Sequence, residues 1–107
     1  MDSQIKKGLI DVCILAVLLK EDSYGYQIIR DVSHLVEISE STLYPVLKRL
    51  QTNNLVTTYD VAYNGRLRKY YKITDKGKLR LIEVKEELES INHIYNYISL
   101  ITKNRRI

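Results

Sequence analysis

Six apolar residues near the C-terminus alternate at spacings of three and four residues: Leu81, Val84, Leu88, Ile91, Tyr95 and Ile98. These are the spacings of the a and d positions of a coiled coil. At about 1.5 Å per residue, a helix from Asp75 to Thr102 would be about 40 Å long. A chain of 107 residues needs no helix of that length for its own core. The pattern predicts a dimerisation arm; packing within one subunit is the alternative.

The N-terminal segment also favours a partner subunit. A helix is predicted from Ser3 to Leu19, and it is apolar nearly all round from Leu9 onward. A helix of this kind is buried on more than one side, and a single small domain has little core in which to bury it. We therefore expect Leu9 and Val12 to join the six heptad residues at a dimer interface.

Two shorter helices are predicted in between. Ser23 is a candidate N-cap for a helix from Tyr24 to Leu35. Ser39 or Ser41 is a candidate N-cap for a third helix that ends near Asn53.

The third helix is predicted to have two unlike faces. One is an apolar stripe, Leu43, Val46, Leu47 and Leu50. The opposite face carries Ser41, Tyr44, Pro45, Lys48, Arg49 and Thr52. Pro45 breaks a local rule, because a proline past the first turn removes a helix hydrogen bond. Such exceptions occur at functional sites. The two faces suit a helix that docks on a domain and enters the major groove of DNA.

A β-hairpin is predicted after the third helix. Strand-like segments run from Leu55 to Ala62 and from Leu67 to Ile73, and the Asn64-Gly65 pair between them favours a two-residue turn. Period-2 alternation predicts that Tyr71 shares the core face with Ile73 and Leu67. Thr74 is expected to cap the last helix.

Positive charge is concentrated in one third of the chain. The chain has a net charge of +4, yet residues 48–80 alone hold nine bases and two acids. Four of the seven residues from Arg66 to Lys72 are basic. This density suits neutralisation of phosphates. A solvated surface that only keeps the protein soluble is the alternative.

Several classes of protein are excluded by what the sequence lacks. With one cysteine and two histidines, it has no usual zinc ligand set. No nucleophile–base pair or phosphate-cradling glycine loop is present, so an enzyme is not expected. No cofactor is expected either. The longest apolar run, Val12 to Leu19, has eight residues, too few to span a bilayer. We expect a cytoplasmic protein that does not bind membranes.

The order of three helices, a hairpin and a final helix predicts a mostly α (α+β) chain with a winged helix-turn-helix fold. Residues 1–73 would form the DNA-binding domain and residues 74–107 the long C-terminal dimerisation helix, together one compact unit. The recognition helix would span about residues 41–53 and the basic wing residues 55–73.

Three motifs make a family resemblance specific. The segment from Ser41 to Leu50, STLYPVLKRL, resembles the recognition-helix motif of the PadR family of transcriptional regulators. DSYGYQI from Asp22 and RKYYKITDKG from Arg68 resemble that family's second-helix and wing segments, in the family's order. The likeness covers about residues 5 to 80, and the short C-terminal region resembles the smaller PadR subfamily. The turn at Asn64-Gly65 is tighter than in many members.

The resemblance implies a homodimeric repressor that binds a pseudo-palindromic DNA operator, with the third helix in the major groove. Carried over by position, it implies that Ser41, Thr42 and Tyr44 lie near bases or phosphates. Lys48 and Arg49 would bind phosphates. Arg66, Arg68 and Lys69 would serve the wing, and the Tyr26 hydroxyl would contact the DNA backbone.

Other interpretations of these residues stay open. Tyr44 could only cover the helix surface, and Arg49 could pair with an acid of the second helix. The whole chain could be a winged-helix module that docks a protein. Some PadR-like proteins resemble multidrug sensors, so a small-molecule effector at the dimer seam is a further alternative; the sequence does not identify one.

Overall fold

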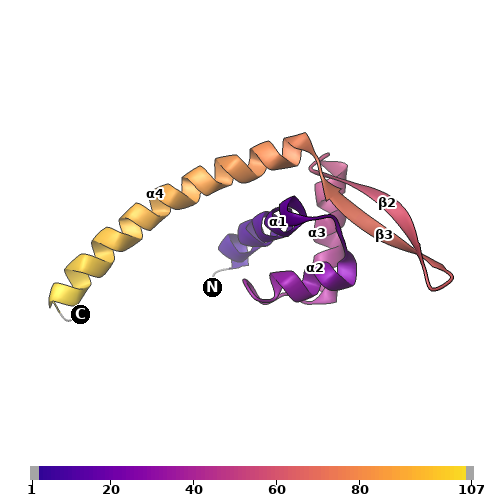
Figure 1. The fold of residues 1–107 in the computed structure, drawn as a ribbon. Coiled ribbons are helices and arrows are strands. Elements are labelled where there is room, and N and C mark those ends of the chain that lie inside the picture. The colour runs from indigo at the N-terminus through magenta and orange to yellow at the C-terminus, as the bar shows by residue number, and fades with distance from the viewer. Residues whose placement is uncertain (1–2, 106–107) are drawn as a thin grey trace.

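The computed structural model describes residues 3–105 and contains four helices and three strands (Figure 1). In chain order they are α1 (Ser3–Lys20), β1 (Ser23–Tyr24), α2 (Gly25–Val32), α3 (Glu40–Thr52), β2 (Val56–Tyr63), β3 (Arg66–Ile73) and α4 (Asp75–Arg105). The predicted winged helix-turn-helix fold, mostly helical with a small sheet, is confirmed.

The strands form an antiparallel sheet in the order β1-β3-β2. Strands β2 and β3 are the two sides of the wing, and their register ends with Tyr63 opposite Arg66. The turn residues Asn64 and Gly65 have φ angles of 49° and 78°. Positive φ at both central positions is the type I′ geometry that matches strand twist, so the predicted turn is confirmed.

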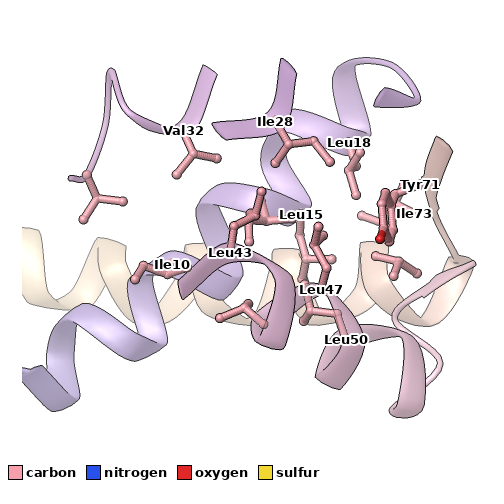
Figure 2. Close-up of a cluster of buried hydrophobic side chains, with 14 residues drawn as sticks. Ile10, Leu15, Leu18, Ile28, Val32, Leu43, Leu47, Leu50, Tyr71 and Ile73 are labelled. Carbon is pink, nitrogen blue, oxygen red and sulfur yellow. The ribbon is translucent and has the colours of Figure 1, made fainter. Parts of the chain in front are cut away.

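The core lies where α1, α2, α3 and the base of the wing meet (Figure 2). All four residues of the predicted α3 stripe are buried, as are Ile10, Ile14, Leu15 and Leu18 of α1 and Ile28 and Val32 of α2. Strand β3 contributes Tyr71 and Ile73, whose side chains lie beside this cluster (Figure 2). Burying a leucine-sized side chain is worth about 1.5–3 kcal/mol, so this cluster fixes α3 on the domain.

Two predictions, one about the end of α2 and one about a residue on the core face of the wing, are wrong. The α2 helix ends at Val32 and not at Leu35 as predicted, and Leu35 is 65% exposed. Leu67 alternates onto the same sheet face as Tyr71 but is 72% exposed. The reason is distance along the wing: Leu67 lies near the tip, beyond the helices that cover Tyr71.

The helix starts also differ in part from the prediction. Ser23 does not cap α2. It belongs to β1, where it pairs with Tyr71 of β3, and Tyr24 occupies the N-cap position. Ser39 is the N-cap residue of α3, although its side chain makes no capping hydrogen bond. The cap at Thr74 is confirmed, since its Oγ1 accepts a hydrogen bond of 3.0 Å from the Gly77 N–H. Pro45 lies inside α3, in its second turn.

The last helix is longer than predicted and projects away from the domain (Figure 1). Its 31 residues correspond to about 46 Å at about 1.5 Å per residue. Only its first part lies against α1, where Leu81 packs on the core and is half-buried. Further along, Ile91 is 59% and Tyr95 64% exposed.

Candidate nucleic-acid interface

The outward face of α3 is polar and exposed, as predicted. Ser41, Thr42, Tyr44, Lys48 and Arg49 are all exposed, while the stripe behind them is buried. At the start of the helix, the Ser39 Oγ lies 2.9 Å from the Ser41 Oγ and 3.2 Å from the Thr42 Oγ1. This end of α3 therefore presents a group of hydroxyls that can donate to or accept from a nucleic acid.

A hollow of about 590 Å³ separates α3 from the wing. Its lining comes from four elements: Tyr24 of β1, Gly25 and Tyr26 at the start of α2, Tyr44 of α3, and Arg68, Lys69 and Tyr71 of β3. The first turn of α2 borders it, and the side chain of the N-cap residue Tyr24 makes no capping hydrogen bond. Free N–H groups at a helix start attract phosphates. The hollow therefore combines three features that suit an anion: cations, hydroxyls and a helix N-terminus.

Tyr44 and Tyr26 lie on the two helices that border this hollow. The Tyr44 ring covers the start of α2, where a Cβ added to Gly25 would lie 2.5 Å from the Tyr44 hydroxyl oxygen. Tyr26 is 59% exposed, and the Arg30 guanidinium lies 5.8 Å from its ring centroid. Burial raises the pKa of the neighbouring Tyr71 hydroxyl, and Tyr44 adds to this, so Tyr71 keeps its proton and can donate a hydrogen bond.

The three wing cations that are predicted to contact DNA differ in their surroundings. Arg66 and Lys69 are exposed and have no acidic partner among the described residues. Arg68 is less exposed, since its guanidinium lies over the rings of Tyr24 and Tyr63. Of these three predicted contacts, two are therefore free cations and one is held by aromatic rings.

Arg49 has a partner within the protein. Its Nη2 donates a hydrogen bond of 2.5 Å to the Asp11 Oδ1, which joins α3 to α1. The sequence had suggested an acid of the second helix, but the acid belongs to the first. Burial raises the pKa of the Asp11 carboxyl, and the Arg49 charge offsets this in part. The pair favours a structural role for Arg49 over the predicted phosphate contact.

The predicted dimer residues fall into two groups. Leu9, Val12, Leu81 and Val84 are half-buried, whereas Leu88, Ile91, Tyr95 and Ile98 are exposed along the free part of α4. An apolar hollow of about 550 Å³ lies between α1 and α4, lined by Val12, Leu19, Leu81, Ile82 and Leu88, with Lys78 and Lys85 at its border.

Within residues 3–105, no three His, Cys, Asp or Glu side chains come together as metal ligands. Over the same residues, every helix is too short or too polar to cross a bilayer. Cys13 is half-buried in α1, and burial raises the pKa of its thiol.

Comparison with known proteins identifies the family. The family described as "Transcriptional regulator PadR-like family" matches residues 14–83, more than half of the chain. The chain belongs to the PadR-like family. It is 38% identical over 98 residues to an uncharacterised protein of Lysinibacillus sphaericus, covering 86% of this chain and 89% of that one.

Solved structures of PadR-like regulators have the same fold. A PadR family transcription regulator from Clostridium difficile matches with a TM-score of 0.77 and 36% identity, covering 83% of this chain and 96% of that one. A PadR-like transcriptional regulator from Bacillus cereus matches with a TM-score of 0.80 and 34% identity, covering 90% and 96%. This PadR-like chain is therefore a DNA-binding transcriptional regulator and not an enzyme.

The structure of this PadR-like chain adds residues that sequence reasoning missed. Tyr24 and Tyr71 line the hollow beside α3, and Tyr59 of β2 donates a hydrogen bond of 2.6 Å to the Asp22 Oδ2. A signal for Tyr59 was available, since Tyr59, Val61 and Tyr63 lie two residues apart in β2 and share one face of that strand. No sequence pattern predicts that β1 pairs with β3, because a strand of two residues is too short to show alternation of apolar and polar residues.

Proposed function

We propose that this protein is a homodimeric, sequence-specific repressor in which α3 enters the major groove and the wing contacts the flanking backbone. The hollow between α3, the start of α2 and β3 carries this proposal, because it brings Lys69 and Tyr44 to one surface. Residues 1–73 would bind DNA and residues 74–107 would join the two subunits.

Each contact residue has a chemical role in the proposal. Ser41, Thr42 and Tyr44 offer hydroxyls to base edges or phosphates, and Lys48 on the exposed face of α3 neutralises a phosphate. Tyr26 gives its hydroxyl to the backbone across the hollow. Arg66 and Lys69 are the wing's phosphate ligands. Arg49 and Arg68 are held by partners within the chain and are not among these direct contacts.

The proposed dimer rests on the exposed apolar residues of α4. Leu88, Ile91, Tyr95 and Ile98 keep heptad spacing along the part of α4 that projects from the domain (Figure 1). Isolated exposed apolar residues are normal, but a continuous stripe at coiled-coil spacing is typical of an interface. A second copy would cover the stripe and place two α3 helices on one side of the particle.

The first test is selection of bound DNA from a random pool with the purified protein. The expected result is a pseudo-palindrome whose half-sites lie about 34–36 Å apart. Affinity should then fall with salt at a log–log slope of about −7 if the dimer neutralises about eight phosphates. A slope near zero, without enrichment of any sequence, would contradict DNA binding and favour a module that docks a protein.

The repressor role needs a separate measurement. A reporter promoter that carries the selected sequence should lose expression when the protein is supplied. A promoter with scrambled half-sites is the control. Increased expression from the intact promoter would show an activator.

A second candidate function, sensing of a small molecule, is supported by the apolar hollow between α1 and α4. A hollow lined by leucine, isoleucine and valine and bordered by two lysines suits an apolar compound with an anionic group. Ligand binding there would change DNA affinity through α1 and α4. Measuring operator affinity while such compounds are titrated tests this candidate function. Unchanged operator affinity at a saturating concentration would contradict ligand sensing and favour an apolar seam that is filled by protein side chains alone.

A further inference from the structure

Arg68 lies between two tyrosine rings on the side of the sheet away from the core. Its guanidinium carbon is 4.0 Å from the Tyr24 ring centroid and 3.8 Å from the Tyr63 ring centroid. Both distances are well within the range of about 6 Å for an attractive cation–π contact. Tyr24 belongs to β1 and Tyr63 to the outer end of β2, so the contact links the wing tip to the body.

A second connection links the other wing strand to the same short segment. The Tyr59 hydroxyl of β2 donates to the Asp22 carboxylate, two residues before Tyr24. The Tyr70 ring lies between the Tyr24 and Tyr59 rings, with centroids 5.4 Å and 5.7 Å away. Residues 22–24 therefore contact both strands of the wing on one face.

These contacts matter because backbone pairing alone holds the wing only at its base. Strand β1 pairs with Tyr70 and Tyr71 of β3, and nearer the tip β3 is paired with β2 alone. Arg66 and Lys69 belong to that outer part. Their distance from α3 thus depends on what restrains the outer wing against α2, whose first residue follows Tyr24.

We infer that Arg68 is a positioning residue: stacked between Tyr24 and Tyr63, it fixes the angle of the wing so that Arg66 and Lys69 meet the phosphates beside the groove that α3 enters. This inference rests on the proposed DNA-binding function and departs from the expectation that Arg68 itself binds a phosphate. The planar guanidinium suits two stacked rings, whereas a lysine ammonium is a compact point charge that does not stack.

The difference between arginine and lysine gives the test. Arg68→Lys keeps the charge and loses the stacking on both rings, and Tyr63→Leu keeps Arg68 and its contact with Tyr24 but removes the Tyr63 ring. Each variant should bind the selected operator about two- to fivefold more weakly, the factor expected from loss of a cation–π contact at an exposed site. The salt slope should stay that of the unsubstituted protein, and the double variant should bind no more weakly than either single one. Arg80→Lys, on α4, is the matched control.

A measurement without DNA keeps the inference falsifiable if a variant is unstable. In the NMR spectrum of the free protein, the Arg68 δ protons should be shifted upfield by ring currents, and Tyr63→Leu should reduce that shift. Unshifted protons, or operator binding by Arg68→Lys equal to that of the unsubstituted protein, would overturn the role of Arg68. Lack of operator binding by the unsubstituted protein would instead overturn the proposed function.

Discussion

The Tyr44 ring occupies the space that a side chain at position 25 would take. A Cβ built on Gly25 would lie 2.5 Å from the Tyr44 hydroxyl oxygen and 2.9 Å from two of its ring carbons. The first residue of α2 must therefore be small for the α3 tyrosine to lie across it. This contact links the two helices of the helix-turn-helix at the hollow where a DNA backbone is proposed to bind.

Substituting Gly25 tests whether the position of the Tyr44 ring across α2 affects DNA binding. In Gly25→Ala the Tyr44 side chain must move, and because its far end is flexible and half exposed, we expect little loss of stability. Operator affinity should fall about tenfold, the effect of one lost hydrogen bond to a charged group. Gly8→Ala is the control, since its Cβ meets nothing within 4 Å. Full affinity in Gly25→Ala would show that Tyr44 only covers the surface of α3.

Lys48 provides the clearest test of phosphate contact on α3. Lys48→Ala should weaken binding to all operator sequences alike and reduce the salt slope by about 0.9 per subunit, the effect of one released phosphate contact. Fluorescence anisotropy at several salt concentrations measures both quantities. Lys103→Ala, at the far end of α4, should change neither. An unchanged slope for Lys48→Ala would remove Lys48 from the interface.

Two exposed leucines on α4 give a matched test of the dimer. Leu88 belongs to the heptad stripe, and Leu79, nine residues earlier, lies on the opposite side of the helix at about 100° per residue. Leu88→Glu should split the dimer, because it places two carboxylates in an apolar seam. Leu79→Glu should leave it intact. Sedimentation equilibrium distinguishes the outcomes, and a dimeric Leu88→Glu protein would show that the seam is assigned wrongly.

The Asp11 carboxyl should make stability depend on pH. Burial, which outweighs the Arg49 charge, raises its pKa above 3.8, so the folded chain binds this proton more readily than the unfolded chain. Its contribution to the free energy of unfolding is then fully present below that value and is lost as pH rises through the raised pKa. Relative to the unsubstituted protein, Asp11→Asn should therefore gain stability as pH rises from 3.8 through the raised pKa. Urea unfolding at several pH values measures this difference. A relative loss with rising pH would mean that the ion pair with Arg49 outweighs burial.

Features of the fold that depend on local sequence could be predicted from the sequence. The stripe from Leu43 to Leu50, the Asn64-Gly65 turn and the Thr74 cap each depend on residues close in sequence, and the structure confirms all three. Ser23 was misread as a helix cap, because serine suits both a cap and a strand edge. Only pairing with Tyr71, 48 residues away, decides between them.

The sequence by itself determined the four helices, the two strands of the wing and the apolar face of α3, since these follow from residue type and local period. Tertiary structure decided which cations are free. Arg49 reaches Asp11 across two helices, and Arg68 is enclosed by rings from two strands, whereas Arg66 and Lys69 meet no acid in the described chain. A charge is the same in every sequence context, but its partner depends on distances that only the folded chain sets.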